Sequence, residues 1–153
     1  MILRVYLDTS VIGGCLDEEF GVYSQRLVDD FDRRRFRAVI SDITLAEMET
    51  APAGVRQLLA RPGFAEAERV EVSDEAVILA DAYIREGAAL ESNRLDALHI
   101  AVATVSRVDV VVSWNFRHIV KLSRIRAYNA ANLKLGYPGL EIRSPLEVYY
   151  EEG

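Results

Sequence analysis

Three acidic residues stand where the side chains of a folded α/β protein would meet. Asp8 directly follows an apolar run at residues 5–7, Glu47 lies just past an apolar segment that ends at Ser41, and Asp96 opens an amphipathic run. Three converging carboxylates repel one another and raise one another's pKa, and a divalent cation relieves that repulsion. Oxygen ligands without cysteine or clustered histidine favour Mg²⁺ or Mn²⁺ over Zn²⁺. Such an ion can clamp a phosphodiester oxygen and activate a bound water.

Asp96 is the most informative of the three acids. It shares one helical face with Ile100, four residues on, and a carboxylate on an apolar face needs a partner or a metal ion. Simpler explanations exist for each acid. Asp8 fits a helix N-cap, Asp96 fits a first-turn partner of the helix dipole, and a glutamate on a helix is usually solvated. We adopt the last explanation for Glu49, whereas the position of Glu47 after a strand, on or near the buried face of a short helix, favours function.

The elements that would position these acids alternate along the chain. Strands are expected at residues 2–7, 36–41 and 108–113, and weaker ones at 69–72 and 141–143. Helices are expected at residues 18–35, 44–50, 52–60, 73–87, 94–106 and 128–135. This alternation predicts a three-layer α/β fold with a parallel sheet of about five strands between helices, and one domain over residues 1–153. In such sheets ligands bind beyond the carboxyl ends of the strands, where the strand order reverses.

The composition indicates the cellular compartment in which the protein is expected. No apolar run approaches the roughly 20 residues that span a bilayer. The N-terminal apolar run, which is short and followed by an acid, fits a buried strand better than a signal peptide. Cys15 is the only cysteine, so an internal disulfide is excluded and a reducing compartment is indicated. We therefore expect a cytoplasmic protein without a membrane partner.

The charge is unevenly distributed. The net charge of −6 argues against a phosphate-rich partner, but residues 110–140 contain no acid and carry +5, which leaves −11 for the rest. The basic residues of this segment are Arg117, Lys121, Arg124, Arg126 and Lys134. The segment is either a chance run of solvated surface or a basic rim that draws nucleic acid toward an acidic centre.

Three sequence segments resemble the PIN-domain family. They are the apolar strand with its acid at residues 6–12 (Tyr-Leu-Asp-Thr-Ser-Val-Ile), the Ala46-Glu47 pair after the second strand, and the Asp-x-x-x-Ile-Ala helix at residues 96–101. The resemblance spans nearly the whole chain and is closest to the VapC-like ribonuclease toxins of toxin–antitoxin pairs. It implies a parallel sheet with a central first strand, a Mg²⁺ or Mn²⁺ site, and cleavage of single-stranded RNA such as tRNA, rRNA or mRNA. It also implies a homodimer and a small antitoxin that blocks the acidic pocket.

The resemblance assigns roles to individual residues. It implies that Asp8, Glu47 and Asp96 are the metal ligands. The residues expected to contact the substrate are Thr9, Ser10, Ser113, Arg117 and Lys121.

One position departs from the family pattern. After the strand at 110–112 the family commonly has a hydroxyl, one further residue and a fourth acid, whereas this chain reads Ser113-Trp114-Asn115. Asn115, kept here as a catalytic candidate, brings no charge, so metal binding should be weaker and one ion should be favoured over two. Asp109 cannot substitute because it begins the strand. The chain is therefore predicted to be a nuclease, with a slow or inactive PIN-like module that binds RNA or protein as the alternative.

Other classes and residues carry weaker signals. A phospho-accepting regulatory domain needs an acidic pair where this chain has Thr9 and Ser10 after Asp8. A metal-dependent phosphatase would share the acidic site. His99 is expected to be a satisfied core histidine, with a contact to Asp96 as the alternative, and Trp114 is expected to pack in the core.

Overall fold

The structure, a computed structural model, describes residues 1–150, so the last three residues of the predicted domain lie outside the described part. Within that part five strands form one sheet in the order β3-β2-β1-β4-β5, and every pairing is parallel. The strands are β1 (Leu3–Leu7), β2 (Phe36–Ser41), β3 (Glu68–Val70), β4 (Val110–Val112) and β5 (Glu141–Arg143). The predicted parallel sheet with a central first strand is confirmed, and each strand lies within two residues of its expected bounds.

The strand order reverses beside β1. The chain builds β1, β2 and β3 outward on one side, then returns to add β4 and β5 on the other side of β1. Leu7 at the end of β1 is paired with Val112 at the end of β4. Asp8 and Ser113 therefore leave the sheet side by side at its carboxyl edge, where ligands bind in folds of this kind.

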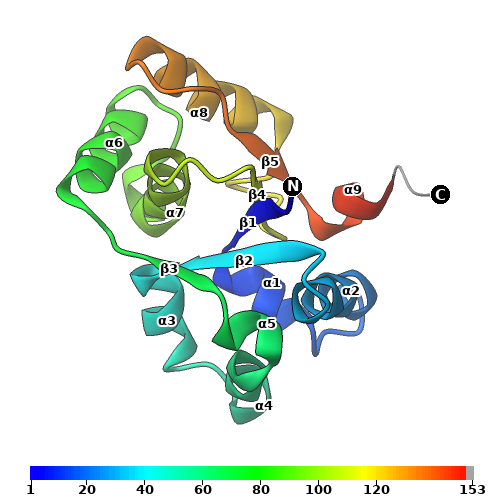
Figure 1. The fold of residues 1–153 in the computed structure, drawn as a ribbon. Helices are drawn as coiled ribbons and strands as arrows, with labels where there is room; N and C mark the ends of the chain where they lie inside the picture. The colour runs from blue at the N-terminus through cyan, green and yellow to red at the C-terminus, as the bar shows by residue number, and fades with distance from the viewer. Residues whose placement is uncertain (151–153) are drawn as a thin grey trace.

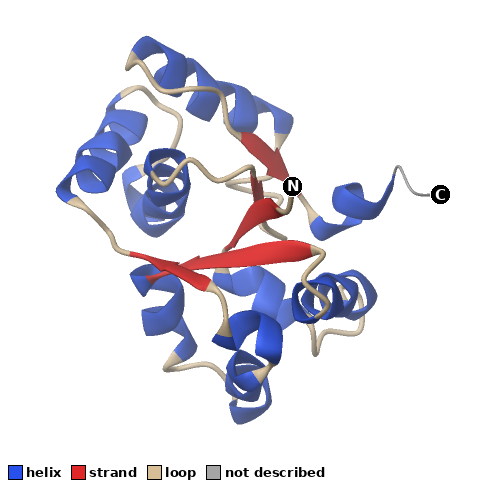
Figure 2. Cartoon of the chain, viewed as in Figure 1, coloured by secondary structure: helices blue, strands red, loops and turns tan. Residues whose placement is uncertain are grey.

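Helices cover both faces of the sheet (Figures 1 and 2). One face is covered by α6, α7 and α8, the other by α1, α2, α5 and α9. The elements are α1 (Thr9–Gly14), α2 (Gly21–Asp32), α3 (Asp42–Met48), α4 (Ala53–Arg56), η1 (Gln57–Ala60), α5 (Pro62–Ala65), α6 (Asp74–Arg85), η2 (Glu91–Asn93), α7 (Arg94–Val105), α8 (Leu122–Lys134) and α9 (Pro145–Tyr150). Among the described residues, no helix has the combination of length and apolarity that crossing a membrane requires.

The central strand shows why its sequence is almost continuously apolar. Val5 and Leu7 face the helices on one side of the sheet and Tyr6 faces those on the other, and all three are buried. Side chains alternate between faces along a strand, so a strand covered on both faces has no solvated side. Tyr6 is the one residue of the run with a polar end, and its hydroxyl belongs to the site described below.

The structure differs from the expected helices at several places. Helices α5 and α9 were not expected, and the helix expected at 52–60 is divided into α4 and η1. Helix α8 begins at Leu122, six residues before the expected start, and none of its first six residues is fully buried, so its start has no apolar stripe to reveal it. Helix α1 was not expected, since Gly13, Gly14 and three β-branched residues disfavour helix. Within the helices expected at 94–106 and 73–87, the spacing of apolar residues predicts that Leu95 and Val77 are buried, but they face solvent with 56% and 41% of their surface exposed.

Candidate active site

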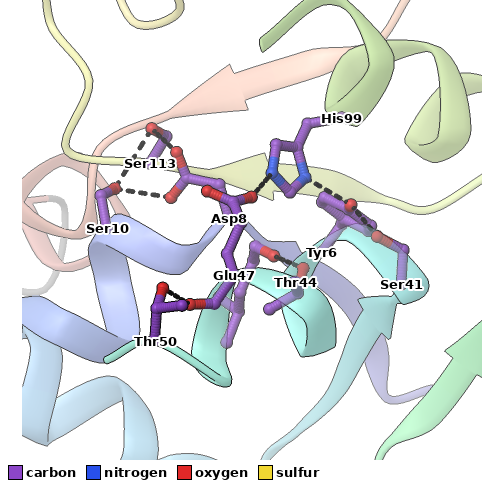
Figure 3. A network of polar contacts seen from close by, with 10 residues as sticks. Tyr6, Asp8, Ser10, Ser41, Thr44, Glu47, Thr50, His99 and Ser113 are labelled. Carbon is purple, nitrogen blue, oxygen red and sulfur yellow. Dashed lines mark hydrogen bonds and ion pairs between the residues drawn. The ribbon is translucent and has the colours of Figure 1, made fainter. Parts of the chain in front are cut away.

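Asp8 is held by two hydroxyl groups at the reversal point of the sheet. It occupies the N-cap position of α1, yet its side chain makes no capping hydrogen bond. Instead its two carboxylate oxygens accept hydrogen bonds from the hydroxyls of Ser10 and Ser113, each at 2.6 Å (Figure 3). Only 5% of Asp8 is exposed. The two serines therefore fix the Asp8 carboxylate, and it does not act as the side-chain cap of α1.

The two serines also tie the loop after β4 to Asp8. The Trp114 backbone N–H donates to Ser10 Oγ at 3.0 Å, and the Asn115 backbone N–H donates to Ser113 Oγ at 2.9 Å. Ser113 has no exposed surface. The structure thus gives Ser113 the role of positioning Asp8, in place of the substrate contact expected from the sequence.

Glu47 lies on α3 and reaches toward the site from the side of β2. Its side chain is 37% exposed. Glu47 follows the buried Ile43 and Thr44 by four and three residues on the helix, so the expected place on or near the buried face is confirmed. Its Oε1 atom lies 2.8 Å from Nε2 of His99. That hydrogen bond is the main reason why the pKa of Glu47 is lowered, and partial burial opposes it. Glu47 is therefore held as a carboxylate.

His99 is the residue whose role the sequence left least clear. It is 3% exposed and bonded through both ring nitrogens, so the expectation of a satisfied core histidine is confirmed. Its partners, however, are Glu47 and Tyr6, and not Asp96. No spacing rule connects residues 47 and 99, which is why the contact was missed.

Asp96 lies half-buried in the first turn of α7. Burial and then the charge of Asp8 raise the pKa of Asp96, while His118, His99 and a hydrogen bond from the Asn115 side chain oppose that rise. The side-chain oxygen of Asn115 accepts the His118 backbone N–H at 2.9 Å, so it is the amide N–H₂ that is free to donate to Asp96. Asn115 therefore stabilises the charge of Asp96 where a fourth acid would oppose it.

The three acids share one electrostatic environment. Burial is the main cause that raises the pKa of Asp8, and Glu47 adds to it, while Ser10, Ser113 and His99 oppose it. Asp8 in turn raises the pKa of Asp96. The carboxylates are close enough to influence one another, and a cation among them would relieve their repulsion.

The donor chemistry fits a hard divalent cation, but the side chains do not form a closed ligand shell. Within residues 1–150, no three His, Cys, Asp or Glu side chains stand close enough together to hold one ion. Asp8 and Glu47 keep free lone pairs beside their hydrogen bonds to the two serines and to His99, but the acids do not yet converge, so at least one side chain must turn before they share an ion. The oxygen donors and the coupled carboxyl groups suit Mg²⁺ or Mn²⁺. The buried Thr9 hydroxyl is a further oxygen atom that suits such a cation. It makes no hydrogen bond of ordinary geometry within the described residues, yet it helps to lower the pKa of Glu47.

Two basic residues of the acid-free segment lie in the loop that follows β4. Arg117 and Lys121 are exposed in the loop after β4 that also carries Asn115. Two others have structural partners, since Arg124 donates to the carbonyls of Gly87 and Ala88, and Lys134 pairs with Glu86. The residues that remain candidates for the predicted basic rim are therefore Arg117, Lys121 and the exposed Arg126 on α8.

Aromatic side chains flank the same loop. The indole N–H of Trp114 donates to Ser24 at 2.7 Å and its ring stacks on Phe20 with centroids 4.3 Å apart, so the expected core role is confirmed. Phe116 packs edge-on against Trp114 and is 46% exposed. This exposed ring beside Asn115 was not identified from the sequence.

The coupled carboxyl groups predict how stability depends on pH. Asp8 and Asp96 bind a proton more tightly when folded than when unfolded. Between the unfolded value of about 3.9 and their raised folded pKa values, the folded state holds more protons, so stability should fall as pH rises. Glu47, with a lowered pKa, acts in the opposite direction at lower pH. In EDTA, the stability advantage of the Asp8→Asn/Asp96→Asn double variant over wild type should grow from pH 4 upward and then level off. A difference independent of pH in urea unfolding would contradict the assignment.

Comparisons with known proteins agree on the architecture. No protein-family model matches the chain, and no curated protein matches it significantly. Three solved structures match over nearly their whole length. VapBC2 from Rickettsia felis bound to a DNA fragment from their promoter matches with a TM-score of 0.56 and 14% sequence identity, over 93% of this chain and 98% of that chain. DNA-bound VapBC from Salmonella typhimurium matches with a TM-score of 0.55 and 23% identity, over 94% of this chain and 99% of that chain. FitAcB from Neisseria gonorrhoeae matches with a TM-score of 0.56 and 15% identity, over 92% of this chain and 97% of that chain. The chain has the PIN-like fold. In this PIN-like fold the site described above lies at the carboxyl end of the central strand.

Proposed function

We propose that the chain is an endoribonuclease of PIN-domain type that cleaves single-stranded RNA with the help of Mg²⁺ or Mn²⁺. The observation that carries the proposal is Asp8: a buried carboxylate, fixed by two serines at the reversal point of the sheet, whose pKa is raised by burial and by Glu47. A buried charge of this kind is unfavourable unless a cation or substrate uses it.

Each residue of the site has a distinct task in this proposal. Asp8, Glu47 and Asp96 would hold the ion, and Asn115 would orient Asp96. A bound Mg²⁺ or Mn²⁺ supplies Lewis-acid activation of the phosphodiester and of water. Ser10 and Ser113 keep both oxygens of Asp8 in place, which reduces the reorganisation that binding requires.

Arg117 and Lys121 are proposed to contact the RNA backbone. Reversing both charges, Arg117→Glu/Lys121→Glu, should weaken the binding of single-stranded RNA and reduce the slope of log K against log salt concentration by about 1.4, since each phosphate contact contributes roughly 0.7. Binding is measured by fluorescence anisotropy between 50 and 300 mM salt on a background of Asp8→Asn, so that the RNA stays intact.

The matched control is Arg33→Glu/Arg107→Glu, which changes the net charge equally. Arg33 and Arg107 are exposed and lie in the turns that lead into β2 and β4, at the amino edge of the sheet, opposite the site. The control should lower affinity slightly and leave the slope unchanged. Equal slopes for the two double variants would place the substrate elsewhere.

An antitoxin partner follows from the same proposal. The matched structures are named as VapBC and FitAcB complexes, or as a toxin–antitoxin complex in the case of Klebsiella pneumoniae. We propose that this chain acts in the cytoplasm as a homodimer and is inhibited by a small antitoxin. Expression of the wild type should arrest growth, whereas expression of Asp8→Asn should be harmless. If a short reading frame adjoins the gene, its coexpression should relieve the arrest. Light scattering of the purified protein tests the dimer.

Asn115 supports a second candidate, a PIN-like module that binds RNA or protein without cutting. The Asn115 side chain opposes the rise in the pKa of Asp96 and brings no charge, so the site has three acids in place of four. Activity gained only when Asn115 is replaced by aspartate would favour this second candidate.

A further inference from the structure

We infer that His99 is a positioning residue for Glu47, and that Tyr6 and Ser41 hold His99 in place. The inference deepens the proposed function and rests on it, because Glu47 is one of the three proposed metal ligands. It assigns a role to a buried polar chain that joins β1, β2, α3 and α7 (Figure 3).

The chain of contacts is continuous and short. The Tyr6 hydroxyl lies 2.7 Å from Ser41 Oγ and 2.7 Å from His99 Nδ1, and His99 Nε2 lies 2.8 Å from Glu47 Oε1. The Tyr6 and His99 rings meet edge to face at 5.7 Å, which fixes the plane of the imidazole. Tyr6, Ser41 and His99 are all buried, and only the Glu47 end reaches solvent.

The direction of the hydrogen bonds follows from the chemistry at the Glu47 end. An ionised carboxylate only accepts, so His99 Nε2 carries the proton of this contact. A neutral imidazole then accepts at Nδ1 from the Tyr6 O–H, and Tyr6 accepts from the Ser41 O–H. Every donor therefore points toward Glu47.

This arrangement does more than satisfy buried atoms. Glu47, which is 37% exposed, could be solvated without a partner, and Tyr6 already has Ser41. An apolar residue at position 99 would avoid burying an imidazole, whose polar atoms are unfavourable in a core unless bonded. What His99 adds is one fixed pose for a glutamate on a seven-residue helix that would otherwise sample several rotamers. Residues that orient metal ligands in this way typically change metal affinity by 10–100-fold when removed.

Two isosteric amides separate the contacts of His99. In His99→Gln the amide nitrogen replaces Nε2 and can still donate to Glu47, whereas in His99→Asn it replaces Nδ1 and reaches only Tyr6. We expect His99→Asn and His99→Leu to raise the Kd for Mn²⁺, measured by titration calorimetry, by roughly 10–100-fold, and His99→Gln to restore most of the affinity. Thermal melting in EDTA identifies any variant that fails to fold, and the Gln–Asn comparison decides the question without the leucine variant.

A double-mutant cycle tests whether His99 acts through Glu47. In a Glu47→Gln background, His99→Asn should leave the Mn²⁺ Kd within about twofold, because the residue it positions is already changed. Additive losses, or a folded His99→Asn protein with wild-type affinity, would overturn the inference.

A metal-free readout separates this inference from the proposed function. The ¹³C signal of the Glu47 carboxyl group in EDTA should shift in His99→Asn and return toward its wild-type position in His99→Gln. A wild-type protein that binds no Mn²⁺ would contradict the proposed function, and the inference would then be judged by this signal. An identical Glu47 signal in wild type and His99→Asn would overturn the positioning role.

Discussion

Substituting asparagine for Asp8 should leave the protein folded, remove most of its stabilisation by Mn²⁺ and lower RNA cleavage by more than roughly 100-fold. Asparagine preserves the size of the side chain and one accepting oxygen, but it removes the charge that would hold a cation. The metal-free variant should be more stable than wild type by about 1 kcal/mol, because burial and the charge of Glu47 disfavour the Asp8 carboxylate.

Melting curves with and without Mn²⁺ measure this effect. At a concentration 100 times its Kd, the ion should stabilise wild type by about 2.7 kcal/mol, roughly 5–10 °C for a chain of this size. Asp8→Asn should gain a small part of that shift. Glu49→Gln is the matched control, since it neutralises an exposed acid beside α3 and should respond like wild type. Equal shifts in wild type and Asp8→Asn would place the ion elsewhere.

The second large effect is expected from Asn115→Asp. The new carboxylate would face Asp96, whose charge the Asn115 amide now stabilises, so metal-free stability should fall by about 1–2 kcal/mol. The same added charge should tighten Mn²⁺ binding by roughly tenfold or more, which corresponds to about 1.4 kcal/mol. Cleavage at limiting Mn²⁺ should rise accordingly.

Asn115→Ala is the comparison that isolates charge from hydrogen bonding. It removes the amide that helps to keep the pKa of Asp96 down and adds no acid, so it should disfavour the Asp96 carboxylate and give no gain in Mn²⁺ affinity. Calorimetric titration and urea unfolding in EDTA provide both quantities. Asn115→Asp with unchanged affinity and unchanged stability would show that position 115 does not face the acidic centre.

The fold was largely predictable because both faces of the sheet are covered. Strands buried on both sides must be apolar. The apolar run that Asp8 follows therefore predicts strand β1, and Asp8 marks the edge of the sheet at which β1 ends. Given parallel strands, Asp8 and Ser113 had to share one edge. The start of α8 at Leu122 was not predictable in the same way, since none of the residues of its first turns is fully buried and no apolar stripe is required there.

The sequence predicted which residues form the site better than it predicted which of them are in contact. Asp8 and Ser113 are 105 residues apart in sequence, and Glu47 and His99 are 52 apart, so no local spacing rule relates them. The sequence places each residue at the end of a strand or on a helix, but the packing of α3 beside α7 decides which side chains touch. Asn115 shows the same limit: its residue type predicted a missing charge, and only the structure shows that its side chain opposes the rise in the pKa of Asp96.

The most direct test of the central claim is cleavage of a labelled, unstructured single-stranded RNA by purified wild-type protein across a Mn²⁺ titration. Parallel reactions contain EDTA in place of the metal, or the Asp8→Asn variant. Metal-dependent ribonuclease activity predicts fragments from the wild type with Mn²⁺ or Mg²⁺, none in EDTA, and more than roughly 100-fold slower cleavage by Asp8→Asn. RNA that is bound but left intact at every metal concentration would contradict the claim in favour of a binding module, and equal cleavage with and without metal would contradict the mechanism.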